Sequence, residues 1–236
     1  MAKLDLRNMD CMEFIRGLPN NSIDICVTSP PYNKKAVGGK IVGAINYNGN
    51  ADNIDECEYQ EWQINVLNEL FRVCDVVFYN HKVRYQDGSA IHPMQWILKT
   101  KWILRQEIIW NRMIAANLRG WRLWGVDERI YWLVKQGKQP EIDQNSAKMT
   151  SIWNIQPETR TFHPAPFPIE IPNRCISIYK NAKSVIDPFC GSGSTAIAAA
   201  RRGIDFYGSE LDKDYFDAMQ KRIKYETAQM DLLITA

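Results

Sequence analysis

Short apolar runs alternate along the chain with segments whose apolar residues recur at helical spacing. Runs of this length, bounded by proline, glycine or polar clusters, are typical of buried strands. We predict strands at 23–28, 74–80, 103–110, 129–134, 184–186 and 204–207, and helices at 58–73, 92–100, 166–179, 194–202 and 212–226, the last capped by Asp212. Because strands that alternate with helices pair in parallel, the pattern predicts an open α/β sheet.

Size and composition favour a single domain over residues 1–236. The 236 residues are enough for one sizeable core, and 45% hydrophobic with 24% charged residues is ordinary for a globular protein. No apolar stretch approaches the ~18 residues of a membrane span, and the N-terminus lacks the apolar centre of a signal peptide. None of the six cysteines forms a C-x-x-C pair, so no metal site is predicted. We therefore expect a cytoplasmic protein that does not interact with membranes.

A glycine-rich turn follows one of the predicted C-terminal strands. Its sequence over 187–195 is Asp-Pro-Phe-Cys-Gly-Ser-Gly-Ser-Thr, in which Gly191 and Gly193 let the backbone turn tightly against a ligand. No lysine follows the glycines as in a phosphate-binding loop. Asp187 is placed to accept a hydrogen bond from an ammonium group. Glu210, at the end of the next strand, is placed to accept hydrogen bonds from ribose hydroxyls. This favours a positively charged, phosphate-free nucleoside cofactor, which S-adenosylmethionine fits; the alternative is a turn with a purely geometric role.

A second turn, Ser29-Pro30-Pro31-Tyr32, ends the predicted strand at 23–28. The amine of cytosine or adenine is a poor nucleophile because its lone pair is delocalised into the ring. The Ser29 hydroxyl and the Pro30 carbonyl can accept the two amine protons, and Tyr32 can stack on a base flipped out of the duplex. The double proline stiffens the turn. A cytosine carbon-5 enzyme would need a cysteine nucleophile after a proline, and none of the six cysteines follows one.

The two turns, in this order, resemble the β-class of DNA amino-methyltransferases. Further segments at 8–11, 18–24, 107–111, 127–131 and 163–168 resemble the family pattern, so the resemblance covers nearly the whole chain. It implies a Rossmann-like fold with a seven-stranded, mostly parallel sheet, helices on both faces and an antiparallel last hairpin. It implies S-adenosylmethionine as methyl donor and a flipped base of double-stranded DNA as acceptor. The implied cofactor-binding residues are Asp10, Cys11, Ser29, Phe167, Asp187, Phe189, Cys190, Gly191, Ser192, Gly193, Ser194, Glu210 and Leu211.

The residue before the double proline bears on the base that is methylated. A turn with Asp at this position is typical of adenine-N6 enzymes, whereas Ser29 resembles the cytosine-N4 group, so cytosine is favoured and adenine-N6 is the alternative. Related enzymes with Asn at this position methylate RNA or protein amides, and Ser29 argues against that activity. A catalytically silent DNA-binding subunit is a further alternative, disfavoured by the intact turn and Glu210. The resemblance also raises a homodimer and a restriction endonuclease as partners.

Basic and aromatic residues interleave between Lys99 and Arg122, with six basic residues against one acidic residue. We predict DNA contacts in 111–125 and in a turn-rich insert at 136–160, where a Trp or Met could fill the gap left by a flipped base. The glycine- and asparagine-rich segment 34–57 is predicted to be a mobile loop that orders over the target base. A solvated basic face with core tryptophans is the alternative. The predicted DNA-binding residues are Lys34, Lys35, Arg112, Arg119 and Arg122.

Overall fold

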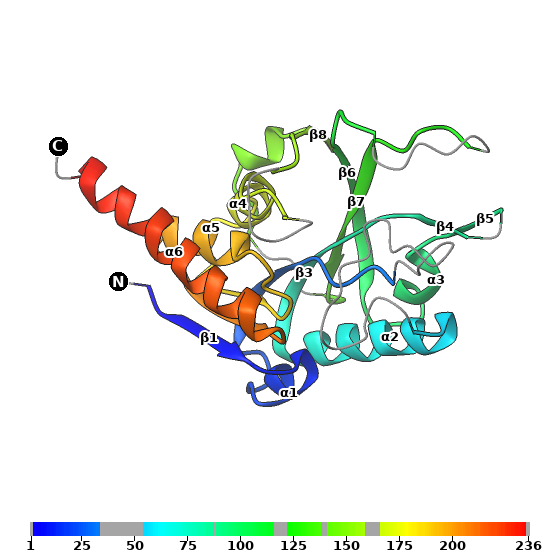
Figure 1. Ribbon diagram of the computed structural model, residues 1–236, viewed down its shortest axis with the longest axis horizontal. Helices are drawn as coiled ribbons and strands as arrows, with labels where there is room; N and C mark the ends of the chain where they lie inside the picture. The colour runs from blue at the N-terminus through cyan, green and yellow to red at the C-terminus, as the bar shows by residue number, and fades with distance from the viewer. Residues whose placement is uncertain are drawn as a thin grey trace.

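A computed structural model describes residues 2–33, 54–86, 88–115, 122–137, 141–158 and 166–234. Its centre is an eight-stranded sheet with the order β1-β10-β9-β2-β3-β7-β6-β8. Figure 1 shows β1 at one end of this sheet and β8 at the other. The strands are β1 (Leu4–Asn8), β2 (Ile23–Thr28), β3 (Cys74–His81), β6 (Ile103–Asn111), β7 (Asp127–Val134), β8 (Ile152–Asn154), β9 (Ser184–Asp187) and β10 (Asp205–Glu210). Among these strands, β7 runs antiparallel to both of its neighbours and the other pairings are parallel. The predicted α/β fold with a mostly parallel sheet is confirmed, with β8 as one strand more than the resemblance implied.

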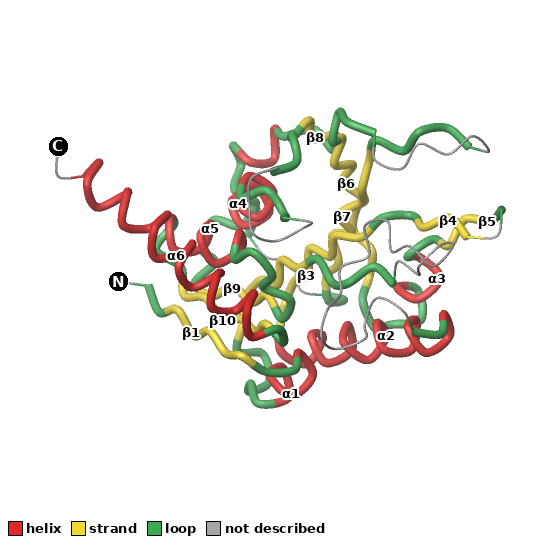
Figure 2. The backbone as a smooth tube through the Cα atoms, viewed as in Figure 1, coloured by secondary structure: helices red, strands yellow, loops and turns green. Residues whose placement is uncertain are grey.

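Helices cover both faces of this sheet (Figure 2). Successive residues of β2 and β3 point to opposite faces, and both faces are buried, which explains their continuous apolar sequence. The helices are α1 (Cys11–Arg16), α2 (Glu56–Val73), α3 (Met94–Ile97), α4 (Glu170–Ser177), α5 (Ser194–Arg201) and α6 (Lys213–Ile234), with a 3₁₀ turn η1 at Ser146–Lys148. One core joins these strands to α1, α2 and α3, and a second core joins them to α4, α5 and α6.

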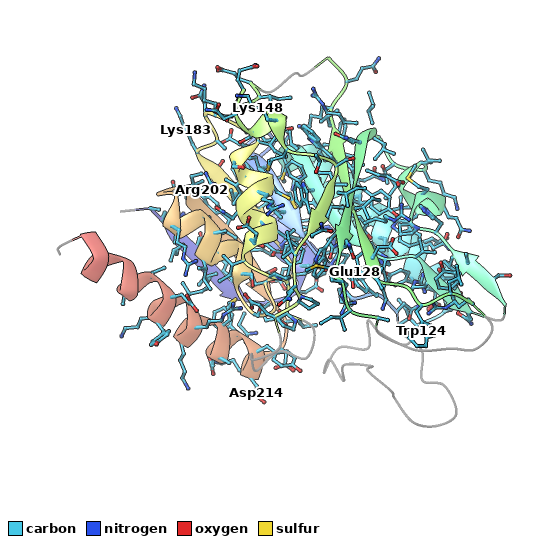
Figure 3. The ribbon with its side chains drawn as sticks, turned by 90° about the horizontal axis from the view of Figure 1, so that it is seen from above. Trp124, Glu128, Lys148, Lys183, Arg202 and Asp214 are labelled. Atoms are coloured by element: carbon cyan, nitrogen blue, oxygen red, sulfur yellow. The ribbon has the colours of Figure 1, made fainter. Side chains whose placement is uncertain are left out.

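The carboxyl ends of the parallel strands meet at one edge of the sheet, which we call the carboxyl edge. Because β7 runs the other way, its first residues lie at the same edge. Figure 3 shows Glu128 and Trp124 at this edge, and Lys148, Lys183 and Arg202 at the opposite one. Ligands of open α/β sheets bind at the carboxyl edge, so side chains that gather there are the candidates for function.

Several elements differ from the sequence prediction. β1 and α1 were not predicted, because β1 is a five-residue edge strand with exposed and half-buried positions and α1 has six residues. A two-stranded hairpin of β4 (Arg84–Gln86) and β5 (Ser89–Ile91) was also missed. α2 begins at Glu56 with Asp55 as its cap, inside the predicted 34–57 loop, and residues 34–53 of that loop lie outside the described part of the chain.

The predicted cap of the last helix is confirmed. An oxygen of the Asp212 carboxylate accepts hydrogen bonds from the backbone N–H groups of Asp214 and Tyr215, at 2.9 and 3.0 Å. Within the described ranges, no helix has the length and apolar character that a membrane crossing needs.

Candidate active site

The glycine-rich turn joins the end of β9 to the start of α5 at the carboxyl edge. Gly191 and Gly193 have φ angles of 49° and 82°, in the left-handed region that favours glycine. A Cβ on Gly193 would lie 2.8 Å from Met219 Cγ and 3.1 Å from Ile223, both on α6. Gly193 is therefore required by its backbone conformation and by the close packing of α6, independently of any ligand.

Asp187 lies buried at the tip of β9 and joins three parts of the site. Its Oδ1 accepts from the Thr28 hydroxyl at 2.7 Å and from the Phe189 N–H at 3.0 Å, and its Oδ2 accepts from the Thr195 hydroxyl at 2.8 Å. Burial raises the pKa of this carboxyl to about 6, although the three hydrogen bonds oppose the rise. Asp187 thus connects β2, the turn and α5, and one acceptor position of its carboxylate remains for a ligand.

Glu210 lies at the tip of β10, beside the turn. Its Oε2 accepts from the Gly191 N–H at 2.9 Å, and its Oε1 accepts from the Asp212 N–H at 3.0 Å. Burial raises the pKa of the Glu210 carboxyl. The side chain of Asn8, at the end of β1, donates to the backbone carbonyls of Glu210 and Leu211 at 2.8 and 2.9 Å. Each carboxylate oxygen can accept a second hydrogen bond, which is the capacity that two ribose hydroxyls need.

The start of α1 lies next to Glu210. Asp10 caps α1 by accepting from the N–H groups of Met12 and Glu13, at 2.8 and 3.1 Å. Cys11 is buried, and desolvation, with smaller contributions from Asp10 and Glu210, raises the pKa of its thiol. The structure therefore brings the predicted pair Asp10 and Cys11 to the same end of the sheet as Glu210.

Of the other predicted cofactor residues, Phe189 and Cys190 are part of the turn, Leu211 follows β10 and Phe167 precedes α4. The Cys190 thiol donates to the Asp187 carbonyl at 3.2 Å, and the Phe189 ring meets Trp62 edge-on at 5.6 Å. The Leu211 residue is 51% exposed. The ring of Phe167 meets the ring of Trp110, near the end of β6, edge-on with centroids 6.4 Å apart.

Arg222 of α6 ties the turn to the segment around Phe167. Its guanidinium donates to the Ser192 carbonyl at 3.0 Å and to the Ser194 hydroxyl at 3.2 Å. It also donates to Glu158 at 2.7 Å, and Glu158 accepts from the Ile169 N–H at 3.4 Å. Sequence reasoning missed Arg222, because it lies on the last helix, outside the recognisable turns.

The second turn leaves β2 next to β3 and β7. The Ser29 hydroxyl donates to Asn80 Oδ1 at 3.1 Å and lies 3.0 Å from the Tyr32 hydroxyl. The Tyr32 hydroxyl is also within 2.8 Å of Asn80 Oδ1 and 2.9 Å of Glu128 Oε2. Asn80 donates its amide N–H to the Arg129 carbonyl at 3.0 Å, which turns its oxygen toward the turn. Asn80 and Glu128, neither of which was predicted, thus accept hydrogen bonds from the two hydroxyls and leave the Ser29 oxygen able to accept a further one.

A buried polar network fixes the backbone of this turn. The Tyr59 hydroxyl donates to the Pro31 carbonyl at 2.7 Å and lies 2.7 Å from His81 Nε2. Gln63 donates to the Tyr59 hydroxyl at 2.9 Å. The ring of Tyr32 packs against His81 with centroids 4.5 Å apart. Such a network makes the turn rigid before any ligand binds, which is what positioning a reacting group requires.

Two of the five predicted DNA-binding residues, Arg112 and Arg122, lie in the described part of the chain, where each contacts another side chain. Arg112 forms an ion pair at 3.0 Å with the buried Glu128, the residue that accepts a hydrogen bond from Tyr32. The Arg122 guanidinium lies 4.3 Å over the Tyr85 ring. Lys34, Lys35 and Arg119 lie outside the described residues.

The predicted insert at 136–160 divides into two parts in space. Ile142 pairs with Tyr179, which lies just after α4, and Lys148 lies at the edge opposite Glu128 (Figure 3). In the second part, β8 (Ile152–Asn154) pairs in parallel with the end of β6, and Glu158 accepts a hydrogen bond from Arg222. A DNA contact from the first part would have to be made far from the two turns.

The arrangement as a whole is that of a nucleoside-binding α/β enzyme, with a glycine-rich turn and carboxylates at adjacent strand ends. Residues 23–221 match the model of a family described as DNA methylase, the N6 and N4 methyltransferases, so the chain belongs to this family of DNA amino-methyltransferases.

Relatives by sequence and by fold agree with this family. The chain is 25% identical to the Type II methyltransferase M.ScaI of Streptomyces caespitosus, over 94% of the chain and 81% of the relative. It is 26% identical to M.BglII of Bacillus subtilis, over 89% of the chain and 66% of the relative. The fold is similar to that of PvuII DNA methyltransferase (cytosine-N4-specific), with a TM-score of 0.77 at 16% identity over 97% and 93% of the two chains. It is also similar to a complex of M1.HpyAVI with S-adenosylmethionine, with a TM-score of 0.62 at 19% identity over 93% and 99%.

Proposed function

We propose that this protein transfers a methyl group from S-adenosylmethionine to the exocyclic amine of a flipped base in double-stranded DNA, with cytosine N4 as the favoured acceptor. One observation carries the proposal. Thr28 directly precedes Ser29, and its hydroxyl donates to Asp187 at 2.7 Å, so the amine-accepting turn and the cofactor turn adjoin at the carboxyl edge. A base held at Ser29 therefore lies next to a cofactor held at Asp187 and Glu210.

The residues at the cofactor turn fit S-adenosylmethionine. Glu210 has acceptor capacity for ribose hydroxyls, and the ionised Asp187 can face a cation in a buried setting where the interaction is strong. The cofactor, when bound, supplies an electrophilic methyl group. The solved complex of M1.HpyAVI with this molecule, in a similar fold, supports the assignment.

The turn at Ser29 makes the base amine nucleophilic. The Ser29 hydroxyl donates to Asn80 Oδ1, 3.1 Å away, so a lone pair of the Ser29 oxygen can accept a hydrogen bond from one N–H of the base amine. The Pro30 carbonyl accepts the other, and together they draw the nitrogen toward tetrahedral geometry. Once it carries the methyl group the nitrogen is strongly acidic and releases its proton to solvent, so no strong base is needed. The contribution of Tyr59 and His81 is to hold the turn still, as positioning residues.

Cytosine is favoured over adenine because of Ser29. A neutral hydroxyl at this position resembles the cytosine-N4 group, and the PvuII enzyme, of similar fold, is described as cytosine-N4-specific. Adenine N6 is the second candidate, since the same acceptors would serve its amine. The relative M.ScaI is described as a Type II methyltransferase. This description supports a role for the present protein in restriction-modification, with a restriction endonuclease as its partner.

Mass spectrometry of nucleosides from DNA of cells that express the chain, against an empty-vector control, tests the proposal. We expect N4-methylcytosine to appear above the control. N6-methyladenine in its place would keep the mechanism and correct the base. Neither product in cells that hold folded, cofactor-binding protein would favour a silent DNA-binding subunit.

Cofactor affinity should depend on the ionisation of Asp187. Its pKa of about 6 in the folded protein means that the carboxyl is charged at pH 7.5 and largely protonated at pH 5. Because the charged form attracts a cation, we expect the Kd for S-adenosylmethionine to rise as the pH falls through about 6. Calorimetric titration between pH 5 and 8 measures this, and Asp187→Asn should remove most of the dependence. An equally steep dependence in Asp187→Asn would assign it to another group.

A further inference from the structure

The segment that joins β6 to β7 ends in a stretch with large exposed apolar side chains. Leu123 is 92% exposed and Trp124 is 61% exposed. The stem of the segment is closed by the Arg112 N–H, which donates to the Val126 carbonyl at 2.7 Å, directly before the strand that carries Glu128. Single exposed apolar residues are normal in proteins, so exposure alone indicates nothing. The way in which this stretch is held is more informative.

Arg122 fixes the backbone of Leu123 from one side. Its guanidinium donates to the Leu123 carbonyl at 3.0 Å and lies 4.3 Å over the ring of Tyr85, on the β4–β5 hairpin. The backbone of Leu123 is therefore braced against the hairpin, while its side chain remains in solvent. A side chain presented on a braced backbone loses less entropy when it enters a partner, which favours binding.

The hairpin is itself anchored to the catalytic turn. Arg84, next to Tyr85, is buried and donates to both carboxylate oxygens of Glu56 at 2.7 Å each. The side chain of Asn33, the residue after Tyr32, exchanges two hydrogen bonds of 3.1 Å with the backbone of Ile54 and lies 3.5 Å from the Glu56 carboxylate. A two-stranded hairpin is marginal by itself, so the Arg84–Glu56 pair sets its position. Leu123 is thereby held in a fixed relation to the turn that would receive the base.

Reach and charge agree with a DNA partner. Leu123 is five residues before Glu128, whose carboxylate contacts the Tyr32 hydroxyl, so at most about 18 Å of extended chain separates them. Arg112 and Arg122 lie on either side of the stretch, where they can approach phosphates. Leucine is among the apolar residues that insert between bases.

We propose that Leu123 inserts into the base stack of duplex DNA and fills the gap left by the flipped target base, braced by Arg122 and the β4–β5 hairpin. The inference rests on the proposed function and deepens it, because it names the residue that stabilises the flipped state. Since Leu123 acts on the duplex and not on the reacting atoms, its loss should matter only where the target base is paired and stacked.

Methylation of two duplexes by purified Leu123→Ala tests the proposal. Both carry the recognition site, identified from methylated DNA of expressing cells, and one has a mismatch opposite the target base. We expect Leu123→Ala to lower kcat/KM at least about tenfold on the matched duplex and to come within about threefold of wild type on the mismatched one, because an unpaired base costs less to flip. Leu123→Met, which keeps an apolar side chain, should retain most of the activity.

Leu98→Ala is the matched control, because Leu98 is a leucine with 72% exposure that follows α3. It should leave both duplexes unaffected. Equal losses of Leu123→Ala on the two duplexes would show a structural role and overturn the insertion, as would no loss on either or an equal loss with Leu98→Ala. If the wild-type protein methylates neither duplex, the proposed function fails as well, which separates the two failures.

Discussion

Asp187→Ala is expected to abolish measurable binding of S-adenosylmethionine. The substitution removes the charge that we propose faces the cofactor cation. It also leaves the Thr28 and Thr195 hydroxyls and the Phe189 N–H without their acceptor. A buried donor without an acceptor costs about 1–3 kcal/mol, so the turn should also reorganise. Calorimetric titration of the folded variant with the cofactor measures the loss.

Asp187→Asn separates the two causes. The amide keeps the size of the side chain and an acceptor oxygen, so we expect a folded protein whose cofactor affinity is at least about tenfold weaker, the effect of about 1.4 kcal/mol. Thermal unfolding followed by circular dichroism checks that both variants are folded. Wild-type affinity in Asp187→Ala would show that the carboxylate has only a structural role.

Tyr32→Ala is expected to keep cofactor binding and to remove turnover. The change deletes the ring that would stack on the base, as well as the hydroxyl that lies between Ser29, Asn80 and Glu128. A displacement of the reacting groups by about 1 Å can cost about a hundredfold in rate, so we expect kcat to fall at least a hundredfold. Single-turnover methylation of duplex DNA with labelled cofactor measures this.

Tyr32→Phe is the companion variant, because it keeps the ring and loses the hydroxyl. If the ring is the important part, it should retain much more activity than Tyr32→Ala. The calorimetric Kd for the cofactor should match the wild-type value in both variants. Turnover of Tyr32→Ala within a few-fold of wild type would remove Tyr32 from the catalytic residues.

The two turns could be predicted from the sequence because each is a continuous run at the end of an apolar strand. Asn80 and Glu128 could not, since they reach Ser29 and Tyr32 only through the strand order β2-β3-β7. The resemblance implied an antiparallel hairpin at the end of the sheet, but the apolar pattern does not show that its second strand lies between β3 and β6. An Asn at the end of the strand after the Ser-Pro-Pro-Tyr turn was the one available signal, because parallel neighbours end at the same edge.

Local patterns also explain the other differences. β1 lies at the sheet edge beside β10, so its sequence, Leu-Asp-Leu-Arg-Asn, needs no continuous apolar run. Arg112 was predicted from the charge of its segment to contact phosphate, and the structure shows that its guanidinium also pairs with Glu128. Charge density along a sequence does not show which arginine has an internal partner. The cytoplasmic location and the homodimer stay predictions.

The pairing of β1 with β10 has a consequence for the order in which the protein folds during synthesis. The backbone N–H of Lys3, just before β1, donates a hydrogen bond to the side chain of Asp205 in β10, which lies 202 residues later in the sequence. At about 5–20 residues per second, a ribosome needs about 10–40 s to deliver the second strand after the first. The nascent chain therefore holds the complete Ser29 turn long before the Asn8–Glu210 contact can form. The turn proposed to hold the base is therefore synthesised first, and the ability to bind a methyl donor is acquired only with the last strand.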